Sequence, residues 1–263
     1  MSSTTTTAAV KPPVLRTITP TTAPISLQPT TIAHIYSPIH TLLVLGLYFL
    51  RFNGLVSDPI STIVQNSIGL AVLQGLYCAI CVPLPVGEKK EKKGRAHAHK
   101  KKDEGNGFIG EVMKEIVPNF LSHFLSVLLT PFLLALLTLF GAPLTPSSAF
   151  QSTYLLSLHL SILSLPPLLY SHVLSTSTVR EIFAAMLPFD EIWGGCVGVV
   201  VGAWFGAVPI PLDWDRDWQR WPVTIVVGSL IGWGVGRALG GTVGWGKRIW
   251  FGGEEEELEK KMQ

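Results

Sequence analysis

Long apolar stretches separated by short polar segments are the feature that most limits how this chain can fold. Crossing the hydrocarbon core of a membrane takes about 20 apolar residues in a helix. Six stretches approach that length, at residues 33–52, 60–82, 116–140, 152–174, 192–210 and 221–239. A hydrophobic share of 48% with 14% charged residues indicates a chain solvated largely by lipid. The sequence therefore predicts an all-α polytopic membrane protein of about six transmembrane helices.

Polar segments flank the predicted six-helix transmembrane domain, which we place at residues 32–246. Residues 1–31 are rich in Thr and Pro and lack the apolar core of a cleaved signal peptide, so we expect a disordered tail. Residues 247–263 contain runs of Glu and Lys and are expected to form a charged C-terminal tail.

A basic segment at residues 87–105 separates the second and third predicted spans. Lys and Arg beside membrane spans are retained on the cytoplasmic side. With six spans, both termini, this segment and the segment around Arg180 all lie on that side. The charge pattern therefore predicts cytoplasmic termini and places the segment between the last two spans on the opposite face.

Few polar residues lie within the predicted spans, and no Asp or Glu is expected to be buried there. An ion-coupled carrier usually needs such a residue, so this pattern disfavours one. The acids that precede the fifth span, Asp190 and Glu191, are expected to cap a helix. We expect His159 to be hydrogen-bonded between helices. The mid-span polar residues are His123, His159, Gln65, Asn66 and Gln74.

Cysteine and metal chemistry receive little support from the sequence. The three cysteines, Cys78, Cys81 and Cys196, lie in apolar stretches, where thiols behave as small apolar groups. No cluster of residues predicts a metal site or a cofactor, and no catalytic residues can be assembled. We therefore expect a protein without catalytic activity of its own.

Glycines recur every four residues in the last two predicted spans, forming two ladders. Small residues at this spacing let membrane helices approach closely. We expect the two spans to pack through these ladders, with alanine substitutions milder than leucine substitutions. Because four residues advance a helix by about 400°, each ladder drifts, and we expect its ends to face other neighbours. The helix-packing glycines are Gly194, Gly198, Gly202, Gly206, Gly228, Gly232, Gly236 and Gly240.

The segment between these two spans is dense in acids, arginines and tryptophans. Tryptophan favours the membrane boundary, so one interpretation is an interfacial hairpin held by Asp–Arg pairs. The other is a partner-binding surface, since Trp and Arg dominate binding energy at many interfaces. The candidate partner-binding residues are Asp213, Trp214, Asp215, Arg216, Trp218, Gln219 and Trp221.

Two motifs in this region resemble the PIG-F family of glycosylphosphatidylinositol (GPI) anchor biosynthesis. They are Leu187-Pro188-Phe189-Asp190 and the segment from Pro211 to Pro222 that contains the candidate residues. The resemblance implies a multi-pass protein of the endoplasmic reticulum membrane. It further implies a noncatalytic, stabilising partner of the large ethanolamine-phosphate transferases, which move phosphoethanolamine from phosphatidylethanolamine to GPI-precursor mannoses on the lumenal face.

The resemblance implies as partners the large transferase subunits and membrane lipids, and it leaves open direct contact with the GPI precursor. The alternative function is a lipid or small-solute carrier or scramblase of the endoplasmic reticulum membrane, because glycine-rich crossing helices also occur in carriers. No nucleic-acid partner is expected.

Overall fold

The computed structural model describes residues 22–84, 107–172, 176–212 and 215–249, and all regular structure in these ranges is helical. This confirms the predicted all-α class. The long helices are α1 (Thr31–Phe49), α3 (Pro59–Cys81), α4 (Gly107–Leu139), α5 (Ser147–Ser171), α7 (Glu191–Ala207) and α8 (Val223–Gly240). Shorter helices are α2 (Phe52–Ser57), α6 (Thr176–Phe183) and the 3₁₀ turn η1 (Asp217–Gln219).

Five of these helices are long and apolar enough to cross a membrane: α1, α3, α5, α8 and the Met113–Leu139 part of α4. The sixth predicted span corresponds to α7, which is apolar but has 17 residues. At 1.5 Å per residue it extends about 25 Å, slightly less than the hydrocarbon thickness. The described chain therefore has five helices of spanning length and one shorter apolar helix.

Local sequence signals explain where two of the helices begin. Asp58 precedes α3, and its side chain accepts a hydrogen bond from the amide of Ser61. Asp190 caps α7 in the same way, through bonds from the amides of Ile192 and Trp193. A side-chain acceptor at this position satisfies amides that have no partner inside the helix. The expectation that Asp190 caps a helix is thus confirmed.

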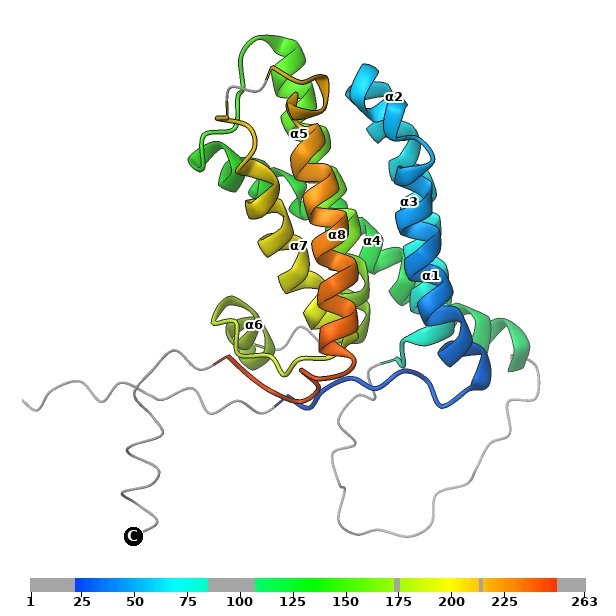
Figure 1. Cartoon of the computed structure of the whole chain (residues 1–263). Helices are drawn as coiled ribbons and strands as arrows, with labels where there is room; N and C mark the ends of the chain where they lie inside the picture. The colour runs from blue at the N-terminus through cyan, green and yellow to red at the C-terminus, as the bar shows by residue number, and fades with distance from the viewer. Residues whose placement is uncertain (1–21, 85–106, 173–175, 213–214, 250–263) are drawn as a thin grey trace, which may run out of the picture.

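The helices run back and forth, so that connections gather at two ends of the bundle (Figure 1). One end holds residues 22–30, α6 and residues 241–249, and the other holds α2 and the segment between α7 and α8. Helix α7 packs mainly against α8, while α5 contacts α3, α4, α7 and α8. Both ends of the described chain therefore lie at the same end of the bundle.

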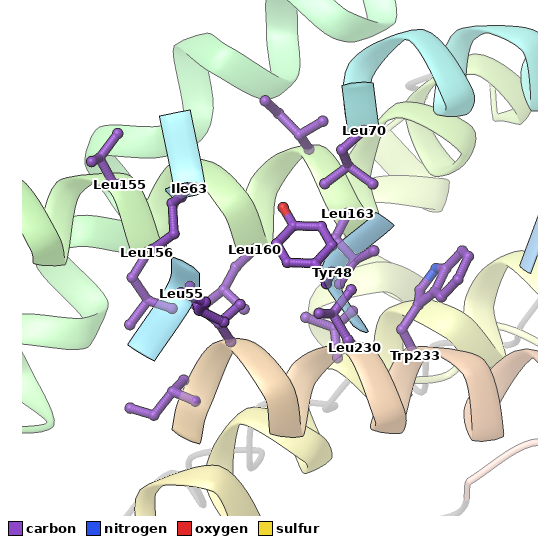
Figure 2. Close-up of a cluster of buried hydrophobic side chains, with 14 of the residues drawn as sticks. Tyr48, Leu55, Ile63, Leu70, Leu155, Leu156, Leu160, Leu163, Leu230 and Trp233 are labelled. Carbon is purple, nitrogen blue, oxygen red and sulfur yellow. The ribbon is translucent and has the colours of Figure 1, made fainter. Parts of the chain in front are cut away.

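A buried apolar cluster joins α1, α2, α3, α5 and α8 (Figure 2). Tyr48 of α1 and Leu163 of α5 lie inside it, and Leu230 and Trp233 bring α8 to the same cluster. Because lipid tails are as apolar as leucine, this cluster gains its stability from close packing more than from escape from water.

The folded region extends further at both ends than the sequence predicts. Residue Ile25 donates its amide proton to Asp190 Oδ2 (2.9 Å), and Gln28 donates its own to the carbonyl of Cys81 (2.8 Å). At the other end, the carbonyl of Lys247 accepts from the amide of Phe189 (2.8 Å). The expectation of a disordered tail through residue 31 therefore fails for residues 22–31. The predicted basic segment and the outer parts of both tails lie outside the described residues.

Candidate partner-binding site

Helices α7 and α8 approach each other backbone to backbone. A Cβ atom added at Gly198 would lie 2.0 Å from the carbonyl oxygen of Gly232, and one at Gly202 would lie 2.1 Å from that of Gly228. Real Cβ contacts essentially never fall below 3.0 Å. The atoms in the way are main-chain atoms, which cannot turn aside as a flexible side chain can. A single added methyl group is therefore already too large here. That alanine is milder than leucine stays a prediction.

The two ladders face each other over the whole length of α7. Gly194 lies against Gly236 and Gly240, and at the other end Gly206 lies against Thr224. The expectation that the ends of the α7 ladder face other neighbours is therefore wrong. A repeat longer than 3.6 residues keeps contact with one partner when two helices wrap around each other with a right hand. Wrapping of this hand is what a four-residue repeat needs if it is to face one partner along its length.

A groove of about 630 Å³ follows the outer side of this hairpin. It extends from Phe189 at one end to Pro209 and Trp218 at the other, and all the ladder glycines except Gly240 line it. Its flanks include Val201 and Ile231, which are 46% and 58% exposed. Another apolar element can therefore come close to the α7 and α8 backbones along this side.

The segment between α7 and α8 is organised around Gln219. The Gln219 amide nitrogen donates to the carbonyls of Pro209 (2.9 Å) and Leu212 (2.8 Å), and its oxygen accepts from the amide of Arg216 (3.0 Å). Gln219 is buried. This predicted partner-binding residue thus holds the shape of the segment and does not present a surface.

The other predicted residues of this segment divide into exposed and packed ones. Asp215 and Arg216 are exposed, and Trp218 is 36% exposed at the end of the groove. Trp221 packs against the main apolar cluster, so it too is structural. One Asp–Arg pair is present within the described part, between Asp217 and Arg220 (3.1 Å). The two remaining candidates, Asp213 and Trp214, lie outside the described residues.

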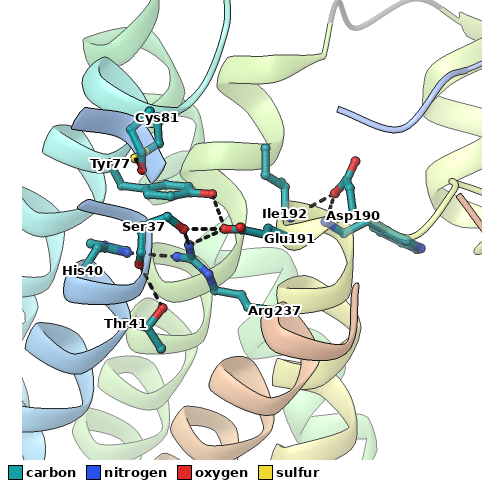
Figure 3. A network of polar contacts seen from close by, with 11 residues as sticks. Ser37, His40, Thr41, Tyr77, Cys81, Asp190, Glu191, Ile192 and Arg237 are labelled. Atoms are coloured by element: carbon teal, nitrogen blue, oxygen red, sulfur yellow. Dashed lines mark hydrogen bonds and ion pairs between the residues drawn. The ribbon is translucent and has the colours of Figure 1, made fainter. Parts of the chain in front are cut away.

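A buried polar cluster around Arg237 was not predicted (Figure 3). Its guanidinium donates to Glu191 Oε2 (2.8 Å) and Ser37 Oγ (2.9 Å) and contacts His40 Nδ1 (2.9 Å). It also lies over the rings of Tyr77 (4.2 Å) and Trp233 (4.9 Å). The side chain is 5% exposed. The cluster ties α1 and α3 to the α7–α8 hairpin.

This cluster and its surroundings contain three acids, all of them outside the predicted spans. Glu191 forms an ion pair with Arg237, and Asp190 and Glu181 are each 1% exposed. Burial raises the pKa of the Asp190 carboxyl, opposed by hydrogen bonds from three amides. All three acids lie at or beyond the ends of helices. The lone arginine within the last predicted span was the available signal, because a charge in a membrane helix needs a partner.

The mid-span histidine His159 joins three helices. Its Nδ1 contacts the hydroxyl of Tyr48 (2.8 Å) and its Nε2 contacts that of Ser229 (3.3 Å). All three side chains are buried, at 0–3% exposure. The predicted interhelical role of His159 is confirmed. Within the described ranges, no group of His, Cys, Asp or Glu is arranged to hold a metal ion.

These observations define the class: a helical, multi-pass membrane protein in which several buried polar side chains join helices. The family model described as PIG-F, a GPI biosynthesis protein family, matches residues 39–241. The chain therefore belongs to the PIG-F family and has a role in GPI biosynthesis, which confirms the resemblance.

Curated relatives agree with this assignment. The chain is 36% identical to glycosylphosphatidylinositol anchor biosynthesis protein 11 of Aspergillus fumigatus, with 87% of this chain and 85% of that protein covered. It is 41% identical to the protein of the same name from Neurospora crassa, with 73% and 68% covered. No solved structure matches the chain.

Proposed function

We propose that this protein is a noncatalytic, stabilising subunit of the GPI ethanolamine-phosphate transferase complexes of the endoplasmic reticulum. In this role it supports the lumenal transfer of phosphoethanolamine from phosphatidylethanolamine to GPI-precursor mannoses. The observation that carries the proposal is the α7–α8 hairpin, whose apolar groove leads to the exposed Trp218.

The hairpin has the properties of a surface for a partner's transmembrane helix. The groove glycines of α8 are half-buried, and those of α7 are buried against α8. Glycine backbone that stays accessible in lipid gains dispersion contacts when another helix approaches, and interfaces between membrane helices are rich in such small residues. At the end of the groove, Trp218 and Arg216 are exposed side chains of the types that dominate binding energy. A transferase with lumenal chemistry would meet both features if this end faces the lumen.

Orientation is part of the proposal. From the charge pattern we propose that both termini lie in the cytoplasm and the segment around Asp217 in the lumen. A glycosylation acceptor inserted beside Asp217, spaced away from the membrane, should be modified. Modification of an acceptor inserted at residues 87–105 instead would contradict this orientation and indicate the opposite one.

Affinity isolation in mild detergent tests the partner directly. Trp218→Ala and Arg216→Ala should reduce recovery of the large transferase subunits and cause GPI precursors without phosphoethanolamine to accumulate. Trp245→Ala is the matched control, because Trp245 is 42% exposed and follows the opposite end of α8. Normal recovery with both loop variants would contradict the proposed surface.

The same experiment separates the two functional classes. If wild-type protein recovers no transferase, and its variants alter lipid or solute movement, the protein is a carrier. If the variants bind transferase normally yet abolish phosphoethanolamine addition, the segment acts on the substrate and the noncatalytic assignment is wrong.

A further inference from the structure

A second pocket, of about 370 Å³, opens between α1 and α8 beside Arg237. Its size lies within the range of small-ligand sites, roughly 300–1,000 Å³. Three small residues of α8 and the turn after it make the space, Gly234, Ala238 and Gly241. Its lining also includes five residues with polar side chains: Ser37, Thr41, Thr242, Glu191 and Arg237. A pocket with this lining differs from the apolar groove of the hairpin.

The pocket lies near one end of the bundle. Glu191 is the first residue of α7, and Arg237 lies in the last turn of α8. Ser37 is in the second turn of α1, about 9 Å along the helix from its start. Headgroups and interfacial water occupy the outer several ångströms on each side of a bilayer. The pocket is therefore placed to meet lipid headgroups.

The two carboxylate oxygens of Glu191 at this pocket differ in their hydrogen-bond partners. Glu191 Oε2 accepts from Ser37 Oγ (2.6 Å), Tyr77 OH (3.2 Å) and Arg237 Nη2 (2.8 Å). No described residue donates to the other oxygen, Oε1, although each carboxylate oxygen can accept about two bonds. The Glu191 side chain is 23% exposed. The pocket wall thus offers a free carboxylate oxygen beside a cation held in place by its neighbours.

We infer that this pocket binds the headgroup of a phospholipid that carries a primary ammonium. The ammonium donates to Glu191 Oε1, and the phosphate lies toward Arg237, with hydroxyls of Thr41 and Thr242 near both. An ammonium has three N–H donors to offer, whereas a trimethylammonium has none. A purely anionic headgroup would meet the carboxylate without compensation. The inference does not rest on the proposed function, because it needs no transferase.

Native mass spectrometry of the purified full-length protein tests this site with defined lipids. Phosphatidylethanolamine should bind about tenfold more tightly than phosphatidylcholine of the same chains, the factor expected for a hydrogen bond between charged groups. Soluble glycerophosphoethanolamine should compete weakly, because it lacks the acyl chains that bring the headgroup to the membrane boundary. Equal binding of both lipids, or preference for phosphatidylglycerol, would overturn the inference. Competition by the soluble compound at equal concentration would overturn the assignment to a lipid.

Two substitutions on α8 locate the site without touching the ion pair. Ala238→Phe fills the pocket from an exposed position, and it should abolish the preference for phosphatidylethanolamine. Val235→Phe, on the groove side and 52% exposed, should leave the preference unchanged. Both variants should fold because neither position is buried. A preference that survives Ala238→Phe, or that Val235→Phe removes, would place lipid recognition elsewhere.

Discussion

The α7–α8 hairpin and the α3–α4–α5 region hold neighbouring helices together in two different ways. In the hairpin, glycines bring main chain against main chain. In the other region, side chains donate to the carbonyls of a neighbouring helix. Asn119 of α4 donates to Gly75 of α3 (2.8 Å), and Gln74 of α3 donates to Leu163 of α5 (2.7 Å). The hairpin depends on close contact between two main chains, and the other region depends on hydrogen bonds from side chains to main-chain carbonyls.

The Gln74 contact shows why a side-chain hydrogen bond is needed in this region. Pro167 lies four residues after Leu163 and has no amide proton, so the Leu163 carbonyl lacks its usual helical partner. A neighbouring helix can supply the missing donor in a membrane, where water cannot. Side-chain bonds thus allow proline in α5, whereas the hairpin gains close contact but admits no added atoms between its two backbones. The two regions should therefore respond differently to substitution.

The largest effect is expected where the hairpin is tied to the rest of the bundle. Arg237→Met removes one member of a buried ion pair and leaves Glu191 without its cation. Breaking such a pair costs about 3–5 kcal/mol. We expect a loss near the lower value, since Glu191 is partly exposed. Thermal unfolding in detergent measures it.

The double variant Arg237→Met, Glu191→Met is the control for this prediction. It removes both charges, so most of the lost stability should return. If it is as unstable as Arg237→Met alone, the shape of the arginine matters more than its charge.

The next largest effect is expected for Gly198→Ala, which adds one methyl group between two backbones. Overpacking costs about 1–3 kcal/mol, and the hairpin helices must move apart to admit it. Gly234→Ala is the matched control on α8, because its added Cβ would lie 3.5 Å from Leu45, an ordinary contact. That control should be neutral or stabilising by up to about 1 kcal/mol through better helix propensity. Equal stability of the two variants would contradict the claim that the space between the α7 and α8 backbones is what limits substitution in the hairpin.

A smaller effect is expected for Gln74→Leu, which leaves the Leu163 carbonyl without a donor. Hydrogen bonds between membrane helices contribute about 0.6 kcal/mol on average, with larger values near 1.7. We expect Gln74→Leu near the upper value and Asn119→Ala near the average, because the Gly75 carbonyl lies within regular helix. Unfolding measurements that reverse this order would argue against the role assigned to Pro167.

Much of the fold follows from the sequence because the length of an apolar stretch and a four-residue glycine spacing are local properties. The predicted spans overlap all six long helices. The Arg237 cluster could not be predicted, because it joins residues of α1, α3, α7 and α8 that only the three-dimensional packing brings together. Likewise, Gln219 and Trp221 resembled surface residues by type, and only their contacts show that they are structural.

The central proposal is that the exposed side of the α7–α8 hairpin binds a transferase subunit. A photoreactive amino acid at Val201, in the groove and 46% exposed, tests it in intact membranes against the same amino acid at Val72 of α3, which is 59% exposed. The account predicts a crosslink to a large transferase subunit from Val201 and only lipid adducts from Val72. Transferase crosslinks from Val72 alone, or from neither position, would contradict it.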